Sequence, residues 1–197
     1  MYGAESDVLV RRFPPADYED PGSWAAATRR HQAELLRIQV EALRIRKYRP
    51  TGGFALDRLL DIAPAISGSL VDHHGASKPA YDQVAASCAE TIVVAAPPLS
   101  DIAPRSTLHF RILIVHDGRA PLNHVRVDAV LAVAEKEKSW SWGGPVEADA
   151  VTLVGTIEHP LGAATGPVDL SLHLVRTTDS ASNSTESADY GTVTNHY

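Results

Sequence analysis

The spacing of apolar residues changes near Glu90, and this change divides the chain into two parts of different fold class. Between residues 21 and 47, a set recurs at alternating intervals of four and three, which places it on one face of a helix: Trp24, Thr28, His31, Leu35, Ile38, Ala42 and Ile45. After Glu90 the apolar residues recur at every second position, as strands require: Leu108, Phe110, Ile112 and Ile114. We therefore predict an α/β part over residues 1–90 and an all-β part over residues 91–197.

The first part begins with a long helix. Asp20 precedes Pro21, which suits a helix cap followed by the first helical position. Pro50 disfavours helical geometry at the residue before it, so the helix must have ended by then. We expect this helix over residues 21–47, with most of its arginines on the solvated face: Arg29, Arg30, Arg37, Arg44 and Arg46.

A strand and a second helix are predicted next. The short apolar segment Phe54–Leu60 favours a strand, and Ser77 and Pro79 favour the start of another helix. On the buried face of that helix we expect Tyr81, Val84, Ala85 and Cys88. Helix, strand, loop and helix in this order are typical of an α/β unit.

The second part contains segments with the two-residue period of a half-buried strand. Three are long, and four are shorter: Leu108–Val115, Val125–Val133 and Val168–Leu174, then Ile92–Ala95, Ser139–Trp142, Val151–Ile157 and Thr192–Tyr197. Short strands separated by Gly, Pro, Asn and Asp predict an immunoglobulin-like β-sandwich. The Ser- and Thr-rich stretch Thr177–Asp189 predicts a mobile loop.

Composition excludes several classes of protein. The chain has 197 residues, a net charge of −6 and a pI of about 5.8, so it lacks the basic character of a general nucleic-acid binder. Cys88 is the only cysteine, which excludes an internal disulfide, and we expect it to be buried. No signal peptide and no apolar run of membrane-spanning length is visible, so we expect a cytoplasmic protein without membrane contact.

No pattern identifies a reaction. Asp72, His73 and His74 offer metal-ligating side chains, but no third ligand is assured by spacing, and we expect neither a metal nor a cofactor. Trp140 and Trp142 lie two residues apart on one predicted strand face, where they can stack on a sugar ring or, as we expect, pack against the opposite sheet. No Ser–His–Asp or Cys–His arrangement is supported by spacing.

The run from Tyr48 to Tyr81 resembles the end of the catalytic barrel in the β-mannosidase branch of glycoside hydrolase family 2. A family motif close to LRRLKYRPTGGF is matched by Leu43, Arg44 and the run from Lys47 to Phe54. A second family stretch ending in Lys-Pro-x-Tyr is matched by Pro64, Ala65, Ser67, Leu70, Asp72, His73, Lys78, Pro79 and Tyr81. The resemblance implies the last strand and flanking helices of a (β/α)₈ barrel over residues 1–90, followed by an immunoglobulin-like domain over residues 91–197.

The resemblance also implies what the chain lacks. The family performs retaining hydrolysis of terminal β-mannosides with two glutamates, in motifs resembling Asn-Glu and Ser-Glu-Phe-Gly, and this sequence contains neither motif. We therefore expect no catalytic residue here, no hydrolysis by the chain alone, and a catalytic pair that is upstream of Met1 or absent. Asp57 and Asp61 are the residues we place next to the substrate. Asp57 and Gly68 stand where the family commonly has tryptophan.

Three roles stay open from the sequence. Residues 1–90 supply only part of a barrel, which takes about 250 residues, so we expect them to need the missing N-terminal part or another chain to fold well. The chain could instead be a non-catalytic carbohydrate-binding or interaction module that uses Trp140 and Trp142. It could also be a decayed gene fragment. The replacement of the family's usual tryptophans by Asp57 and Gly68 is consistent with this interpretation.

Overall fold

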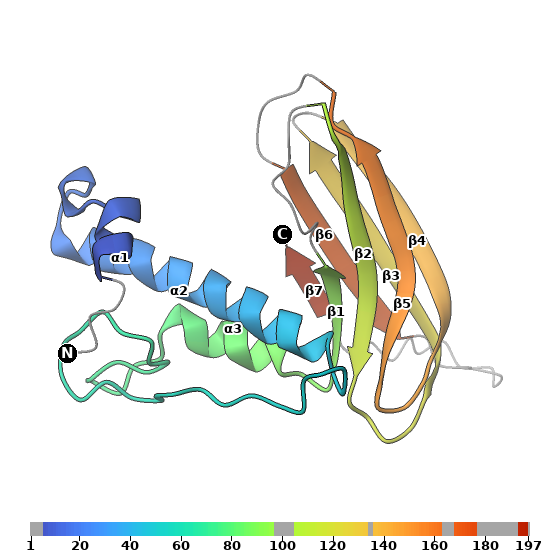
Figure 1. Ribbon diagram of the computed structural model, residues 1–197, viewed down its shortest axis with the longest axis horizontal. Coiled ribbons are helices and arrows are strands. Elements are labelled where there is room, and N and C mark those ends of the chain that lie inside the picture. The colour runs from blue at the N-terminus through green and yellow to red at the C-terminus, as the bar shows by residue number, and fades with distance from the viewer. Residues whose placement is uncertain (1–5, 97–104, 134–135, 163–167, 177–192, 197) are drawn as a thin grey trace, which may run out of the picture. The chain divides into compact units, whose positions relative to one another are not determined.

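The chain forms two compact units. The computed structural model describes residues 6–96, 105–133, 136–162, 168–176 and 193–196 (Figure 1). One unit, here called the helical unit, comprises Met1–Leu43 and Thr51–Ala89. The other, the sandwich unit, comprises Arg44–Pro50 and Glu90–Tyr197. Residues 44–50, which run from the end of the predicted long helix toward the predicted strand Phe54–Leu60, thus belong to the sandwich unit.

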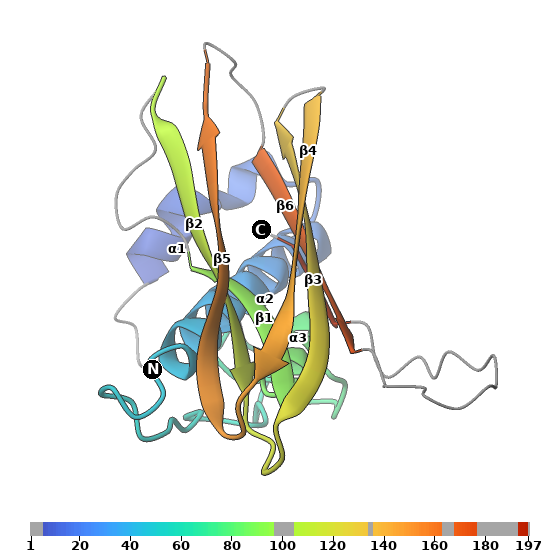
Figure 2. The same cartoon turned by 90° about the vertical axis from the view of Figure 1, so that its right-hand side faces the viewer.

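The sandwich unit contains all seven predicted strands. They are β1 (Thr91–Ala96), β2 (Thr107–His116), β3 (Leu122–Val133), β4 (Lys136–Val146), β5 (Ala150–Pro160), β6 (Val168–Arg176) and β7 (Val193–His196). They form two antiparallel sheets, one of order β1-β2-β5 and one of order β4-β3-β6-β7 (Figures 1 and 2). The predicted β-sandwich is confirmed, whereas the predicted loop Thr177–Asp189 lies outside the described residues.

Alternating apolar residues build the core between these sheets. Leu108, Ile112 and Ile114 of β2 are fully buried, as are Leu170 and Leu172 of β6. Because side chains alternate across a strand, each sheet directs one apolar row inward. In β1 and in the second half of β2 the other row is buried as well. Burial of this apolar surface holds the sandwich together without help from a disulfide.

The helical unit is built on a capped long helix. It contains α1 (Ser6–Arg12), the short 3₁₀ helix η1 (Pro15–Asp17), α2 (Pro21–Arg44), whose last residue groups with the sandwich unit, and α3 (Pro79–Ser87). Asp20 caps α2 through Oδ1, which accepts from the Ser23 amide at 2.8 Å, and Ser23 Oγ accepts from the Asp20 amide at 3.3 Å. These reciprocal bonds satisfy helix-end donors, so the predicted start of α2 is confirmed.

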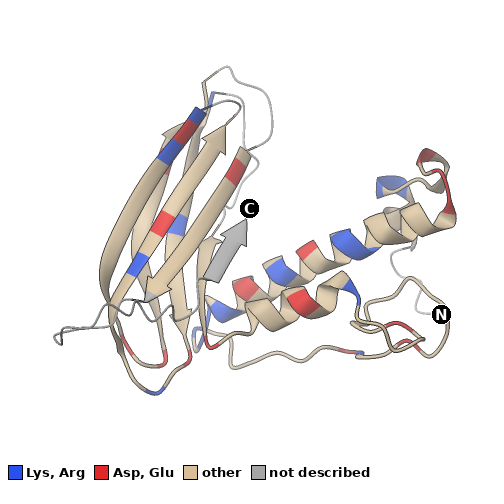
Figure 3. Ribbon diagram, turned by 180° about the vertical axis from the view of Figure 1, so that it is seen from behind, with Lys and Arg blue, Asp and Glu red and all other residues tan. Residues whose placement is uncertain are grey.

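The buried face of α2 differs from the predicted one. Leu35 and Ile38 are each 43% exposed, while Arg37 and Glu41 are 8% and 4% exposed and form an ion pair at 3.4 Å. The expected placement of the arginines was therefore wrong for Arg37 and for Arg44, which is also buried. The spacing of the apolar residues identified the helix. Which face of the helix is buried depends on the elements that pack against it, and the spacing does not show these. Figure 3 shows acidic and basic residues following one another along α2.

The strand predicted at Phe54–Leu60 is not formed. Residues 52–59 have neither helical nor strand structure, and Leu60 makes only a single parallel bridge to Val71. A strand is stable only when neighbours satisfy its backbone groups, and this segment has just that one bridge among the described residues. The last strand of a barrel is therefore not observed.

The second helix is confirmed, but with a different buried face. Ala80, Val84 and Ser87 are buried on α3, whereas Tyr81 is 42% exposed. The face is rotated by about one residue from the predicted one, because α3 packs its Ala80 side toward α2 and the loop before it. Cys88 is exposed, which corrects the expectation that it is buried.

The two units differ in how well they cover their apolar residues. The core of the helical unit is a small cluster of Leu70, Ala80 and Val84. Many large apolar side chains of this unit are exposed: Val8, Val10, Leu35, Ile38, Phe54, Leu56, Leu59, Leu60, Ile62, Ile66 and Tyr81. Among the described helices, none has the length and apolar character needed to cross a membrane.

Candidate functional site

Asp57 and Asp61, the residues predicted to lie near a substrate, have different environments. Both belong to the irregular segment that follows Gly53. Asp57 is exposed, whereas Asp61 is only 4% exposed. The structure therefore leaves the Asp57 carboxylate open to solvent and turns the Asp61 carboxylate into the helical unit.

A buried ion pair holds Asp61. Lys78 is 2% exposed, and its Nζ lies 2.6 Å from Asp61 Oδ2 and donates to Ser69 Oγ at 2.8 Å. Ser67 Oγ donates to the second oxygen of Asp61 and lies 3.3 Å from the ammonium. A buried charge is tolerated only when it is paired and hydrogen-bonded, and this network meets both conditions. We call these four residues the Asp61–Lys78 network.

The network fixes the charge of Asp61. Burial alone would raise the pKa of this carboxyl, but hydrogen bonds from Lys78 and the two serines outweigh burial and lower it from 3.8 to about 2. The group is thus ionised at neutral pH and paired with an ammonium. Such a carboxylate is poorly suited to donate a proton, and its chemical effect is to cross-link the loop between residues 61 and 78.

The loop also contains Asp72, one of the metal-ligating candidates. Asp72 Oδ1 accepts from the backbone amides of His74 and Ala76, both at 3.0 Å, and Oδ2 lies 3.6 Å from Arg29. The bond from Ala76 is the main cause of the lowered pKa of Asp72. Within the described residues, no group of His, Cys, Asp and Glu has the arrangement of a metal site.

Trp140 and Trp142 lie on the core side of β4. Both are partly buried and pack against the core of the sandwich. The indole of Trp142 lies over Gly155 of β5, where a Cβ atom would come within 2.2 Å of the ring. Lys138 Nζ lies 5.0 Å from the ring centre of Trp140. Packing between the sheets accounts for both positions, and sugar stacking by these residues stays a prediction.

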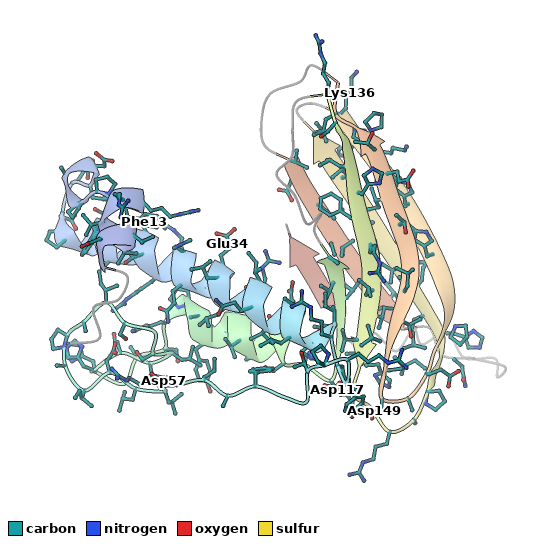
Figure 4. All side chains as sticks on the ribbon, viewed as in Figure 1. Phe13, Glu34, Asp57, Asp117, Lys136 and Asp149 are labelled. Atoms are coloured by element: carbon teal, nitrogen blue, oxygen red, sulfur yellow. The ribbon has the colours of Figure 1, made fainter. Side chains whose placement is uncertain are left out.

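A second polar cluster lies in the sandwich unit. Arg44 Nη2 donates to Asp117 Oδ2 at 2.7 Å, and Lys47 Nζ donates to Asp117 Oδ1 at 2.6 Å. Lys47 also donates to Asp149 Oδ1, and Tyr48 OH donates to Asp149 Oδ2 at 2.9 Å. We call these five residues the clasp. Figure 4 shows the labelled Asp117 and Asp149 next to each other at one end of the sheets.

The clasp stabilises the charged forms of its carboxylates. Burial would raise the pKa of Asp117, but the bond from Lys47 and the charge of Arg44 outweigh this and lower it. The pKa of Asp149 is lowered first by its hydrogen bond with Lys47 and then by that with Tyr48. Burial opposes the charge of Lys47, yet the two carboxylates raise its pKa overall. The cluster binds the segment at the end of α2 to two loops of the sandwich.

Sequence reasoning found only part of these clusters. Arg44, Lys47 and Tyr48 belong to the family-like motif, but no role followed from it. Asp117 and Asp149 lie in the β2–β3 and β4–β5 turns, where an aspartate is expected for turn formation alone. The only sequence feature that could have indicated this cluster is a charged residue in each of two turns at the same end of the predicted sandwich.

Comparisons with known proteins give a structural likeness and no match by sequence. No protein-family model matches the chain, and no curated protein matches it. Among solved structures, it is similar to the β-D-mannosidase of Dictyoglomus thermophilum, with 17% identity and a TM-score of 0.62. That match covers 81% of this chain and 18% of the β-mannosidase, so the chain spans less than a fifth of the length of that protein. The likeness supports a fold of the same kind as part of this enzyme.

Two further structures are similar over about half of the chain. R. palustris CsgH matches with 10% identity and a TM-score of 0.34, over 54% of this chain and 89% of CsgH. Spo0M, a sporulation control protein from Bacillus subtilis, matches with 10% identity and a TM-score of 0.32, over 55% of this chain and 47% of Spo0M. Scores this low support no conclusion about the fold or its use.

Proposed function

We propose that this chain is the C-terminal section of a glycoside hydrolase of family 2 that resembles a β-mannosidase, with retaining hydrolysis of terminal β-mannosides as the reaction of the whole enzyme. The extent of the structural likeness carries this proposal. The match to the β-D-mannosidase covers 81% of the chain, whereas the sandwich unit holds only residues 44–50 and 90–197. A match of that extent must include part of the helical unit, where the second family-like stretch, from Pro64 to Tyr81, also lies.

Exposed apolar residues in the helical unit support the same proposal. Leu59 is 62% exposed and Ile62 is 94% exposed, and both belong to the segment that resembles the region of the last barrel strand. Large apolar side chains gathered on the surface of a unit mark a face that another protein segment covers. We infer that the partner is the preceding part of the hydrolase, supplied by the same polypeptide or by another chain.

In this proposal the chain closes the barrel and carries the terminal immunoglobulin-like domain. A retaining glycosidase needs a carboxylic acid and a carboxylate about 5 Å apart. Asp61 cannot supply either role while it is paired with Lys78 at 2.6 Å, and Asp57 stands alone on an exposed segment. The catalytic pair therefore comes from polypeptide outside these 197 residues, and the chain alone hydrolyses no glycoside.

The experiment starts from the genomic DNA before the codon for Met1. We expect an open frame that encodes the two missing glutamates, and we expect the joined protein to hydrolyse an aryl β-mannoside while the purified 197-residue chain does not. Turnover by the short chain, unaffected by a change of expression host, would overturn the proposal. A neighbouring frame unrelated to glycosidases would also overturn it.

Binding measurements separate this proposal from a carbohydrate-binding role. We expect the 197-residue chain to show no affinity for mannan oligosaccharides in calorimetry. If it binds them and Trp142→Ala abolishes binding while the chain stays folded, the sandwich is a binding module and the proposal is wrong. A chain variant with Tyr81→Ala, a substitution of an exposed ring outside the sandwich, is the matched control.

A further inference from the structure

Residues 44–50 follow α2 without a break in the chain, yet they group with the sandwich unit. The helical unit resumes at Thr51. The sequence of the helical unit is therefore interrupted after Leu43 by a short segment that packs with the sandwich unit. Such a short segment stays ordered only through specific contacts, because ordering each residue costs backbone entropy.

The clasp supplies an attachment in which every carboxylate oxygen of Asp117 and Asp149 accepts a hydrogen bond, with Lys47 bridging the two residues. The two oxygens of Asp117 accept from Arg44 and Lys47, and those of Asp149 accept from Lys47 and Tyr48. The side chains of Arg44 and Lys47 are only 8% and 14% exposed. Hydrogen bonds between ionised groups are the strongest that side chains form, and partial burial reduces their screening by salt.

The sandwich side of the clasp is held in place by its own backbone. The Asp117 amide donates to Glu90 O at 2.8 Å, and the Asp149 amide donates to Gly118 O at 2.9 Å, which ties the two turns together. Gly118 leaves room for the His116 ring, because a Cβ atom there would lie 2.3 Å from that ring. The backbone of both turns is therefore held by hydrogen bonds that do not involve the basic segment.

Backbone conformation points to the same contact. Tyr48 has φ = 61° and Asp149 has φ = 53°, and these two residues are hydrogen-bonded to each other. Residues other than glycine rarely adopt positive φ, and they keep it only where the surrounding structure compensates its cost. Both residues of this contact therefore have an uncommon backbone conformation.

We propose that the Asp117–Asp149 turns are a recognition surface for the basic segment Arg44–Pro50, and that this segment folds with the sandwich and stays bound to it when the helical unit unfolds. All contacts used here lie within the sandwich unit, so the inference does not depend on a glycosidase origin. The attachment gives the sandwich a discontinuous sequence, and its sequence signature is Arg-x-x-Lys-Tyr followed by aspartates at two turns.

Hydrogen exchange of the full chain in graded denaturant tests the proposal. We expect a denaturant concentration at which the amides of residues 25–42 exchange freely while those of β2 and β3 stay protected. At that concentration the amides of residues 45–49 should follow the strands. If they exchange together with α2 instead, the segment belongs to the helical unit and the proposal is wrong.

The double variant Asp117→Asn/Asp149→Asn tests the surface itself. Loss of its charges should speed exchange in residues 45–49 by roughly tenfold or more, with the strands unchanged. Asp128→Asn is the matched control, because Asp128 also lies on the sandwich and accepts from Ser141 at 2.6 Å without touching the segment. Should the double variant unfold, Lys47→Met on an intact surface gives the same readout. Exchange unchanged by Lys47→Met and by about 1 M NaCl would overturn the proposal.

Discussion

Replacing Lys78 by methionine tests how the helical unit is held together. Methionine keeps most of the side-chain length but removes the ammonium, which leaves the Asp61 carboxylate buried without its cation. Removing one partner of a buried ion pair costs about 3–5 kcal/mol. A pKa lowered from 3.8 to about 2 corresponds to about 2 kcal/mol of stabilisation of ionised Asp61 at neutral pH. We therefore expect Lys78→Met to cost at least about 2 kcal/mol of local unfolding free energy.

Hydrogen exchange measured on the full chain reports this loss. Peptides from the loop at residues 61–78 and from α3 should exchange roughly thirtyfold faster or more in Lys78→Met, because 1.4 kcal/mol corresponds to about a factor of ten. Asp57→Asn is the matched control, since it changes an exposed aspartate of the same segment. Its effect should stay within about 0.5 kcal/mol. Amides of β2 should keep their exchange rates in both variants.

The pH dependence gives an independent check through Asp61→Asn. Because the pKa of Asp61 is lower in the folded protein than in the unfolded chain, its stabilisation is fully present above 3.8 and is lost as the pH falls through about 2. Protection of the wild type over Asp61→Asn should therefore be largest above about pH 4 and should shrink below it. If Lys78→Met exchanges as slowly as Asp57→Asn, the buried pair does not hold the unit and this reasoning is refuted.

Three further predictions concern the sandwich unit. Gly118→Ala should lower its stability by about 1–3 kcal/mol, because the added Cβ meets the His116 ring at 2.3 Å, and a thermal unfolding midpoint equal to that of the wild type would contradict this. Gly155→Ala should displace the indole of Trp142, which a Cβ would approach to 2.2 Å, and should shift tryptophan emission to longer wavelength; unchanged emission would place the indole elsewhere. The clasp should open in acid, because Asp117 has a lowered pKa and its contribution, present above 3.8, is lost as the pH falls through the lowered value. Exchange of residues 45–49, corrected for intrinsic rates, measures this opening, and a flat profile down to about pH 2 would count against it.

The sandwich was predictable because its signals are local. In the first half of β2 and in β6 the alternation of apolar and polar residues specifies both the strand and its inward face. Turn residues between the strands then mark where each one ends. A strand of this kind needs only to be paired with a similar neighbour, and the sequence contains several.

The helical unit was less predictable because its contacts are not local. The apolar period of α2 correctly identified a helix, but nothing in that period indicated that Arg37 and Glu41 are buried while Leu35 is exposed. Likewise, Phe54–Leu60 has the composition of a strand and lacks the neighbours that would make it one. The Asp61–Lys78 network joins residues far apart in the chain, and no spacing rule brings them together.

Two of these errors bear on what the chain is. The predicted buried face of α2 and the predicted strand at Phe54–Leu60 each assumed burial of an apolar residue, Leu35 and Leu59 respectively, that the described structure leaves exposed. A sequence selected to fold by itself would place such residues in its core, as the sandwich does with Leu108 and Leu172. The exposed apolar residues between residues 6 and 89 therefore agree with our proposal that other polypeptide completes the core of this unit.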